Sequence, residues 1–210
     1  MRMLAMVLIA SLASATLGAA QERSRDTGGG DLGPYVRAGV GLLNVSGDCS
    51  PCAEWGGGGV SLTSALGWRF SRRFSVAIGV DGGDRIQDQT RERAAHLSVG
   101  TRVDVWKGLA LVSGVGPLRV RQDVAVFGGE VPLKGSGTGW LAGGEYALPM
   151  GDRLILTPAV VFRGSTPMDL ERDGTAVIPR YSYRSVELSV SVVWTLRSLI
   201  WLRGTDLAPE

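Results

Sequence analysis

The stretch Tyr183-Arg184-Ser185-Val186-Glu187-Leu188-Ser189-Val190-Ser191-Val192-Val193-Trp194-Thr195-Leu196 determines the fold class of this chain. Successive side chains of a β-strand point to opposite faces, so the even-numbered residues from Val186 to Leu196 form one wholly apolar face. The residues between them, beginning with Ser185 and Glu187, are mostly small or polar. About 9–11 residues with this two-residue period are what a tilted strand needs to cross a membrane in a closed barrel. The stretch therefore predicts a transmembrane β-strand.

Seven earlier segments alternate in a comparable way, and each is predicted to form a strand. They span residues 35–43, 59–70, 74–81, 95–105, 109–118, 138–148 and 154–163. Short turns are expected at 71–73, 106–108 and 149–152, and long loops at 44–58, 82–93, 119–135 and 164–182. An even number of strands, with short turns at one end and long loops at the other, is typical of outer-membrane barrels. The predicted fold class is all-β, an eight-stranded antiparallel transmembrane up-and-down β-barrel.

Aromatic residues near the strand ends support this interpretation, because membrane barrels carry aromatic girdles at both interfaces. Tyr35, Trp68, Phe74, Tyr146 and Trp194 are expected near the short turns, and Trp55, Trp140, Phe162 and Tyr183 near the long loops. A soluble, secreted barrel that binds a ligand in its interior would show the same period turned inside out. The polar face holds mostly Gly, Ala, Ser and Thr, which suits a narrow lumen better than a solvated surface. We therefore favour the membrane barrel and keep the soluble barrel as an alternative.

The N-terminus has the pattern of an export signal. Arg2 precedes an apolar run from Leu4 to Leu17, and small residues follow up to Ala20. The expected organisation is a signal peptide at 1–20, a flexible lead-in at 21–33, a barrel at 34–196 and a short periplasmic tail at 197–210. With 22 basic and 20 acidic residues, the formal charge of +2 gives no indication of a nucleic-acid partner.

The two cysteines, Cys49 and Cys52, lie in a Gly-rich stretch of an exported chain, which favours a disulfide within a loop. A redox motif is less favoured, because the glycines at 56–59 are poor helix formers and such a motif needs a following helix. Two thiols and the distant His96 fall short of the four ligands of a structural zinc site. We expect no metal and no cofactor.

Seven charged residues share the parity of the inward face. They are Arg37, Asp81, Arg102, Asp104, Glu145, Arg163 and Glu187, and Arg69 lies near the short-turn rim. Unpaired charges in a narrow lumen are costly, so these residues are expected to form ion pairs, with Glu145 paired to Arg102 or Arg37. Such a network either plugs the barrel or acts as a gate that rearranges to pass small ions. We favour the plug, because side chains fill the interior of an eight-stranded barrel.

His96 and Ser98 are two residues apart on a predicted strand and could in principle form part of an esterase site. Outer-membrane lipid A deacylases use a similar pair together with a carboxylate, and Asp88 and Glu92 are nearby in sequence. However, His96 and Ser98 have the parity of the lumen, whereas a lipid substrate requires side chains that face the bilayer. A hydrogen-bonding pair within the lumen is the preferred interpretation.

The segment Trp140-Leu141-Ala142-Gly143-Gly144-Glu145-Tyr146-Ala147-Leu148, together with the last strand, resembles the small outer-membrane barrels of the OmpA/OmpX type. The resemblance covers residues 34–196. It implies a non-enzymatic monomer in the outer membrane of a diderm bacterium, with a structural role or a surface-interaction role through its outer loops. The implied partners are outer-membrane lipids and, during biogenesis, periplasmic chaperones and the barrel-assembly machinery. A gated ion or solute pore and a lipid-modifying esterase remain alternatives.

Overall fold

The computed structural model describes residues 32–48, 55–87, 90–126, 129–151 and 153–196. The predicted signal peptide, nearly all of the lead-in, the tail and the pair Cys49 and Cys52 lie outside these residues. Within the described part of the chain, no helix is long and apolar enough to cross a membrane.

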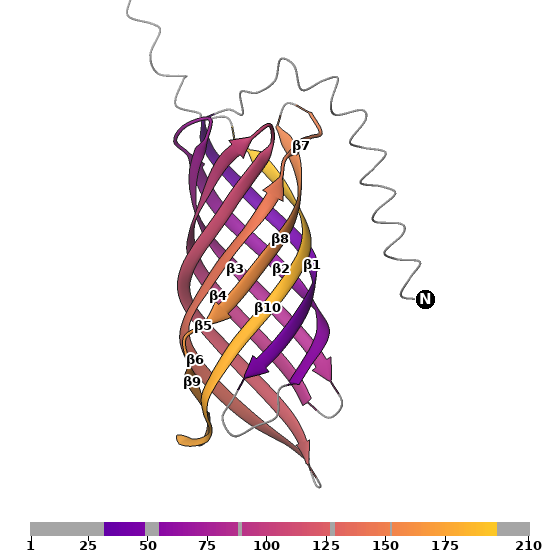
Figure 1. The fold of residues 1–210 in the computed structure, drawn as a ribbon, viewed down its shortest axis with the longest axis vertical. Coiled ribbons are helices and arrows are strands. Elements are labelled where there is room, and N and C mark those ends of the chain that lie inside the picture. The colour runs from indigo at the N-terminus through magenta and orange to yellow at the C-terminus, as the bar shows by residue number, and fades with distance from the viewer. Residues whose placement is uncertain (1–31, 49–54, 88–89, 127–128, 152, 197–210) are drawn as a thin grey trace, which may run out of the picture.

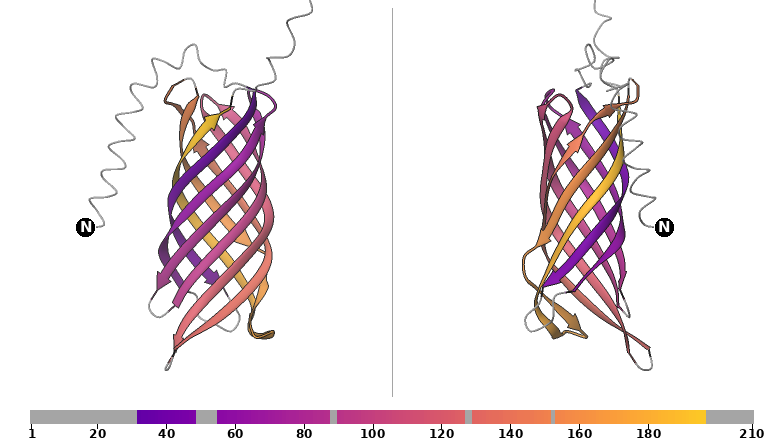
Figure 2. Two further views of the ribbon diagram at one scale, coloured as in Figure 1. Left: turned by 180° about the vertical axis from the view of Figure 1, so that it is seen from behind. Right: turned by 45° about the vertical axis from the view of Figure 1, so that its right-hand side comes forward.

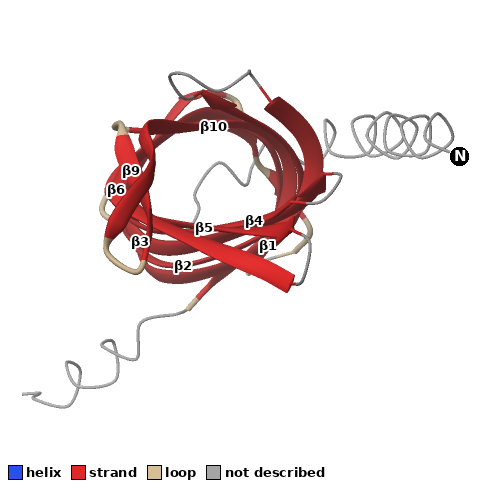
Figure 3. Ribbon diagram, turned by 90° about the horizontal axis from the view of Figure 1, so that it is seen from below, coloured by secondary structure: helices blue, strands red, loops and turns tan. Residues whose placement is uncertain are grey.

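Within the described ranges, ten strand segments form one antiparallel sheet that closes on itself (Figures 1 and 2). The segments are β1 Gly33–Asp48, β2 Trp55–Arg69, β3 Phe74–Gln87, β4 Thr90–Trp106, β5 Leu109–Val126, β6 Gly129–Tyr146, β7 Leu148–Pro149, β8 Leu154–Ser165, β9 Met168–Arg172 and β10 Thr175–Thr195. Closure is made by β1 and β10, which pair from Tyr35↔Thr195 to Asp48↔Ser182. The view along the barrel axis shows the resulting ring (Figure 3).

Two of these segments continue a neighbouring strand, so the ring contains eight strands. β7 extends β6 and pairs with the start of β8. β9 extends β8 beyond an interruption at Thr166 and Pro167, where the backbone N–H of Thr166 donates to the carbonyl of Thr138. Proline has no N–H to donate to a ladder, which explains why the strand breaks here. The predicted eight-stranded antiparallel barrel is confirmed.

The short turns lie together at one end of the barrel, at the top of Figure 1. The turn between β4 and β5 is formed by Lys107 and Gly108, which have positive φ angles of 26° and 89°. The turn after β2 is closed by the backbone N–H of Phe70, which donates to the carbonyl of Phe74 at 3.1 Å. These positions match the short turns predicted from the sequence.

Most of the predicted long loops are wrong, because the strands continue through them. β3 and β4 extend to Gln87 and Thr90, and β5 and β6 extend to Val126 and Gly129. Much of the predicted loop at 164–182 consists of β9 and the start of β10. The hairpins of β5–β6 and β9–β10 project at the end opposite to the short turns (Figure 1).

The side-chain pattern inverts where these strands pass from the middle of the barrel into the projecting part. On β5, the exposed residues Leu111 and Val115 are followed by exposed Arg119 and Arg121, while Leu118 faces inward and is buried. A strand segment in hydrocarbon presents apolar side chains outward, whereas a segment in water presents charged side chains outward and apolar ones inward. The inversion therefore marks the outer edge of the membrane-spanning zone.

The outer surface of the middle of the barrel is apolar on every strand, as lipid contact requires. Highly exposed side chains include Val40 at 61%, Leu62 at 66% and Leu188 at 55%. Soluble monomers rarely expose a continuous apolar patch larger than a few hundred Å². Two polar side chains on this face, Thr101 and Ser113, lie 2.9 Å apart and form a hydrogen bond with each other. This surface is suited to hydrocarbon.

Several residues of the predicted aromatic girdles lie on the outer face as expected, but two do not. Trp68, Phe74 and Trp194 are exposed toward the short-turn end, and Trp140 and Phe162 lie on the outer face of β6 and β8. Tyr35 and Tyr183, by contrast, are only 7% and 4% exposed and face the lumen. Their odd-numbered positions share the parity of the inward residues, which the sequence interpretation did not apply to them.

Candidate functional site: the lumen of the barrel

The first layer of the lumen, nearest the short turns, is an ionic cluster around Glu145 on β6. Glu145 is 2% exposed and accepts from Arg37 Nη1 on β1 and from Arg102 Nε on β4, each at 2.5 Å. Arg102 also pairs with Asp104 two residues along the same strand. Arg37 donates from Nε to the hydroxyl of Ser191 at 2.9 Å. The structure thus brings one carboxylate between two guanidinium groups from different strands.

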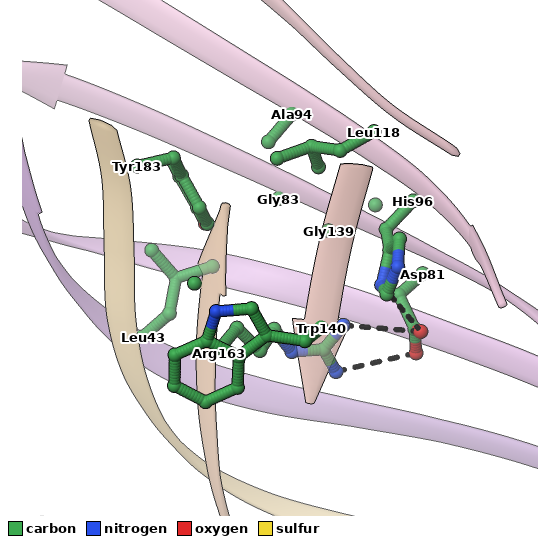
Figure 4. Close-up of a pocket in the computed structure, with 12 residues that line it drawn as sticks. Leu43, Asp81, Gly83, Ala94, His96, Leu118, Gly139, Trp140, Arg163 and Tyr183 are labelled. Atoms are coloured by element: carbon green, nitrogen blue, oxygen red, sulfur yellow. Dashed lines mark hydrogen bonds and ion pairs between the residues drawn. The ribbon is translucent and has the colours of Figure 1, made fainter. Parts of the chain in front are cut away.

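A second ionic cluster is centred on Arg163 of β8. Its Nη1 lies 3.1 Å from Asp81 Oδ2, and its Nη2 lies 3.0 Å from Glu187 Oε2. His96 Nδ1 is 4.0 Å from the same Asp81 oxygen, so three strands contribute to one carboxylate environment (Figure 4). The His96 ring packs against Gly139, where an added Cβ would lie 2.9 Å from the ring. Glycine on β6 therefore makes the space that this histidine occupies.

A chamber of about 100 Å³ lies between the two ionic clusters. Its lining includes Arg102 and Arg163, one from each cluster, and the polar side chains of Thr63, Ser98 and Ser189. A cavity of this size, lined in part by charged and hydroxyl groups, has room for several water molecules, since about 10–15 Å³ of such volume holds one. A second cavity of about 20 Å³, lined by Asp81, His96 and Arg163 among others, has room for one more (Figure 4).

The outer half of the lumen is closed by an apolar cluster. Its buried members come from five strand segments and are Leu43, Val45, Leu118, Val120, Leu133, Met168, Leu170, Tyr181 and Tyr183. Leu170 and Tyr181 are fully buried, at 0% exposure. These side chains occupy the outer half of the lumen with apolar groups.

A polar group caps the apolar cluster on its outer side. Glu92 on β4 is 2% exposed and accepts from the Tyr181 hydroxyl at 2.8 Å, from Gln122 Nε2 at 2.7 Å and from Arg85 Nη2 at 3.2 Å. Burial raises the pKa of the Tyr181 hydroxyl, and the neighbouring Glu92 carboxylate raises it further. Tyr181 therefore stays protonated and acts as a donor to Glu92.

The structure places all seven charged residues of the predicted lumen network on the inner wall, in two separate groups. Arg37, Arg102, Asp104 and Glu145 form the first cluster, and Asp81, Arg163 and Glu187 form the second. The chamber between them separates the two groups. Within the described residues, no set of three or more His, Cys, Asp and Glu side chains is arranged to hold a metal ion.

His96 and Ser98 also lie inside, with exposures of 4% and 5%. His96 Nδ1 lies 4.0 Å from the carboxylate of Asp81, which is held by Arg163. The strand wall separates both side chains from the bilayer, so an acyl chain embedded in lipid does not reach them.

The apolar cluster and its polar cap were missed by the sequence analysis. A signal was present, because Leu118, Val120 and Gln122 alternate with Arg119 and Arg121. The strand was expected to end at Leu118 and residues 119–135 to form a loop, although the apolar residues beyond Leu118 keep a two-residue period with inward parity. A strand that leaves the membrane shows this inverted order.

A closed eight-stranded ring with an apolar outer belt and a filled lumen defines the chain as a small outer-membrane β-barrel protein. Comparison with solved structures agrees. The neisserial surface protein A is similar with a TM-score of 0.53 and 16% identity, covering 78% of this chain and 97% of that protein. Ail, the attachment invasion locus protein of Yersinia pestis, is similar with a TM-score of 0.55 and 9% identity, covering 78% of this chain and 100% of Ail.

The same Yersinia pestis protein, in complex with the heparin analogue sucrose octasulfate, gives a TM-score of 0.54 at 8% identity. No protein-family model and no curated protein matches the chain. At these identities the similarity establishes the fold, which is the fold implied by the sequence resemblance.

Proposed function

We propose that this chain is a non-enzymatic outer-membrane protein that presents its projecting β-hairpins to molecules outside the cell. The observation that carries the proposal is the division of the barrel into two parts. The membrane zone is a closed wall whose lumen holds the two ionic clusters, and the strands continue beyond it, where the apolar cluster occupies the lumen and charged side chains face water. A pore that passes ions or solutes would keep its lumen open. In this barrel side chains occupy the lumen, and the projecting strands add surface outside the membrane zone.

The filled lumen argues against the pore alternative. A hydrated ion entering from the short-turn end would meet the Glu145 cluster, then the Arg163 cluster, and finally the apolar cluster around Leu170. The two ionic clusters could exchange partners, as a gate requires, but the apolar cluster offers an ion no replacement for its hydration shell. The barrel is therefore expected not to conduct.

Surface interaction is supported by the extent of the outer hairpins. Ail, which has the same fold, is by its name an attachment and invasion protein, and one of its structures contains a heparin analogue. For the present chain, attachment would be mediated by the β5–β6 and β9–β10 hairpins, which carry exposed Glu130, Arg172 and Arg180.

The experiment has two parts. The mature chain, refolded in detergent and checked for a closed barrel by its heat-dependent gel mobility, is inserted into planar bilayers. We expect no stepwise current, and steady channels would overturn the closed-lumen part of the proposal.

The second part measures adhesion of cells that carry the chain in their outer membrane to surfaces coated with heparin or with serum proteins. A matched variant has residues 124–131 replaced by Asn-Gly, which shortens the β5–β6 hairpin while keeping the pair Asp123↔Pro132 beside a two-residue turn. We expect the native chain to raise adhesion and the shortened variant to lose part of the gain. Equal adhesion of cells with and without the native chain would refute the surface role.

A further inference from the structure

A group of four basic side chains lies on the outer face of β4, β5 and β6, and we call it the basic ledge. Its members are Arg93, Arg119, Arg121 and Lys134, all of them exposed. The strand register aligns them, because Arg93 pairs with Arg121 and Arg121 pairs with Lys134. Arg119 lies on the same face of β5, two residues closer to the membrane zone. Like charges directly opposite one another on a sheet are destabilising, so this arrangement works against the stability of the fold.

Ion pairs with other described residues neutralise only part of the positive charge of the ledge. Asp123 is buried between two arginines of the ledge. Its Oδ2 lies 2.5 Å from Arg93 Nη2, and its Oδ1 lies 2.8 Å from Arg121 Nε. Arg119 and Lys134 have no ion pair with any residue in the described part of the chain.

Acids flank the ledge on both sides. Asp84 stands opposite Arg93 on β3 but pairs with Arg91, and Glu171 stands opposite Lys134 on β9. The middle of the ledge, around Arg119, therefore keeps an excess of positive charge.

The height of the ledge on the barrel indicates what it faces. Arg119 is the first charged outward residue of β5 beyond the apolar positions Leu111 and Val115. On β6, Trp140 is 46% exposed, and the outward positions farther from the short turns, Thr138, Ser136 and Lys134, are polar. Exposed Trp is typical of the boundary between hydrocarbon and headgroups. The ledge thus stands just outside the hydrocarbon zone, at the depth of the lipid headgroups on the side opposite the short turns.

We propose that the basic ledge binds the phosphate groups of lipid headgroups in the outer leaflet. Guanidinium groups bind phosphate through paired N–H donors, and lysine adds a point charge. A phosphate at the ledge would bring negative charge to Arg119 and Lys134, whose repulsion from Arg93 and Arg121 is only partly relieved by Asp123. This site lies on the outer wall and is separate from both the lumen and the hairpin tips, so it goes beyond the proposed surface role.

The test measures binding of lipids to the full mature chain in detergent by native mass spectrometry. The probes are diphosphoryl lipid A, monophosphoryl lipid A and a phosphatidylcholine with acyl chains of similar length. We expect affinity to rank in that order and to fall as salt is added. Equal affinity for the three lipids would overturn the proposal, because the acyl chains alone would then account for binding.

The variant Arg119→Gln/Lys134→Gln removes the two basic groups of the ledge that form no ion pair with any described residue. At about a factor of five per basic group near a charged surface, it should weaken diphosphoryl lipid A binding roughly 30-fold. The matched control Arg72→Gln/Lys107→Gln removes the same charge from exposed turns at the opposite end and should leave binding unchanged. Each single variant, Arg119→Gln and Lys134→Gln, should show part of the loss.

Heat-dependent gel mobility shows that each variant has closed its barrel before lipid is added. Equal losses in the ledge variant and the control variant would contradict the proposal, since they would reflect net charge without position. Inorganic phosphate at the same molar concentration should not displace the lipid, because a free ion lacks the anchoring acyl chains. Displacement at that concentration would assign the site to free phosphate instead of lipid.

Discussion

Replacing Glu145 with glutamine is expected to destabilise the barrel more than any other single change at a charged residue in the first ionic cluster. The substitution keeps the size of the side chain and removes its charge. It leaves Arg37 and Arg102, whose side chains are 17% and 11% exposed, facing each other without the carboxylate that lies between them. Removing one partner from a buried ion pair leaves an uncompensated charge, at a cost of about 3–5 kcal/mol.

We expect the loss of unfolding free energy to lie at the lower end of this range. Asp104 remains beside Arg102, and the chamber next to the cluster has room for water that partly solvates both guanidinium groups. We therefore expect a loss of about 3 kcal/mol, roughly a hundredfold in the unfolding equilibrium. Unfolding by urea in detergent micelles, followed by the mobility of folded and unfolded forms on gels, measures this loss.

A matched control is available at the outer end of the barrel. Asp84 pairs with Arg91, but both side chains are substantially exposed, at 34% and 47%. Exposed ion pairs contribute little to stability, so Asp84→Asn should leave the urea midpoint of unfolding almost unchanged. If Glu145→Gln also leaves the midpoint unchanged, the description of the first cluster as a buried, mutually dependent set of charges is wrong.

Three further predictions concern packing and pH. Leu170→Ala removes a fully buried side chain from the apolar cluster and should cost about 2–5 kcal/mol in the same urea assay, a loss that an exposed position such as Leu62→Ala should not show. Gly116→Ala would place a Cβ 2.0 Å from the carbonyl oxygen of Leu97, so it should lower stability by about 1–3 kcal/mol or slow refolding, and unchanged refolding would refute the close approach of β4 and β5. Burial acts to raise the pKa of Asp123, but hydrogen bonds from Arg121 and Arg93 outweigh it and hold the pKa below its usual 3.8. The stability that this ionised carboxylate contributes is therefore present above about pH 4 and lost as pH falls further, and Asp123→Asn should remove that part of the acid dependence.

The alternation of Val186 to Trp194 with Glu187 and the serines was sufficient to predict a barrel strand and its inward face. Parity is a local property, since each side chain points opposite to its neighbour. The same rule predicted an inward position for Glu145. Glu145 was expected to pair with Arg102 or Arg37, and the structure shows both pairs. The choice between them depends on the stagger of β1, β4 and β6, which no local pattern encodes.

The outer half of the barrel was predicted poorly for a physical reason. Leu118 and Val120 have inward parity, while Arg119 and Arg121 face outward, and this order is the opposite of that in the membrane zone. A prediction that requires apolar residues outward and polar residues inward therefore ends each strand at the membrane boundary. The rule fails beyond that boundary because the solvent changes from lipid to water while the strand continues.

Spin-label accessibility along β5 tests the central claim most directly, namely that a closed barrel crosses the membrane and that its side-chain pattern inverts at the membrane boundary. Cys49 and Cys52 are replaced by serine, and single labels are attached in turn at positions 111, 115, 119 and 121 of the chain reconstituted in lipid. We predict high accessibility to oxygen at positions 111 and 115, and high accessibility to a water-soluble relaxant at 119 and 121. High accessibility to the water-soluble relaxant at all four positions would contradict the membrane barrel and its boundary.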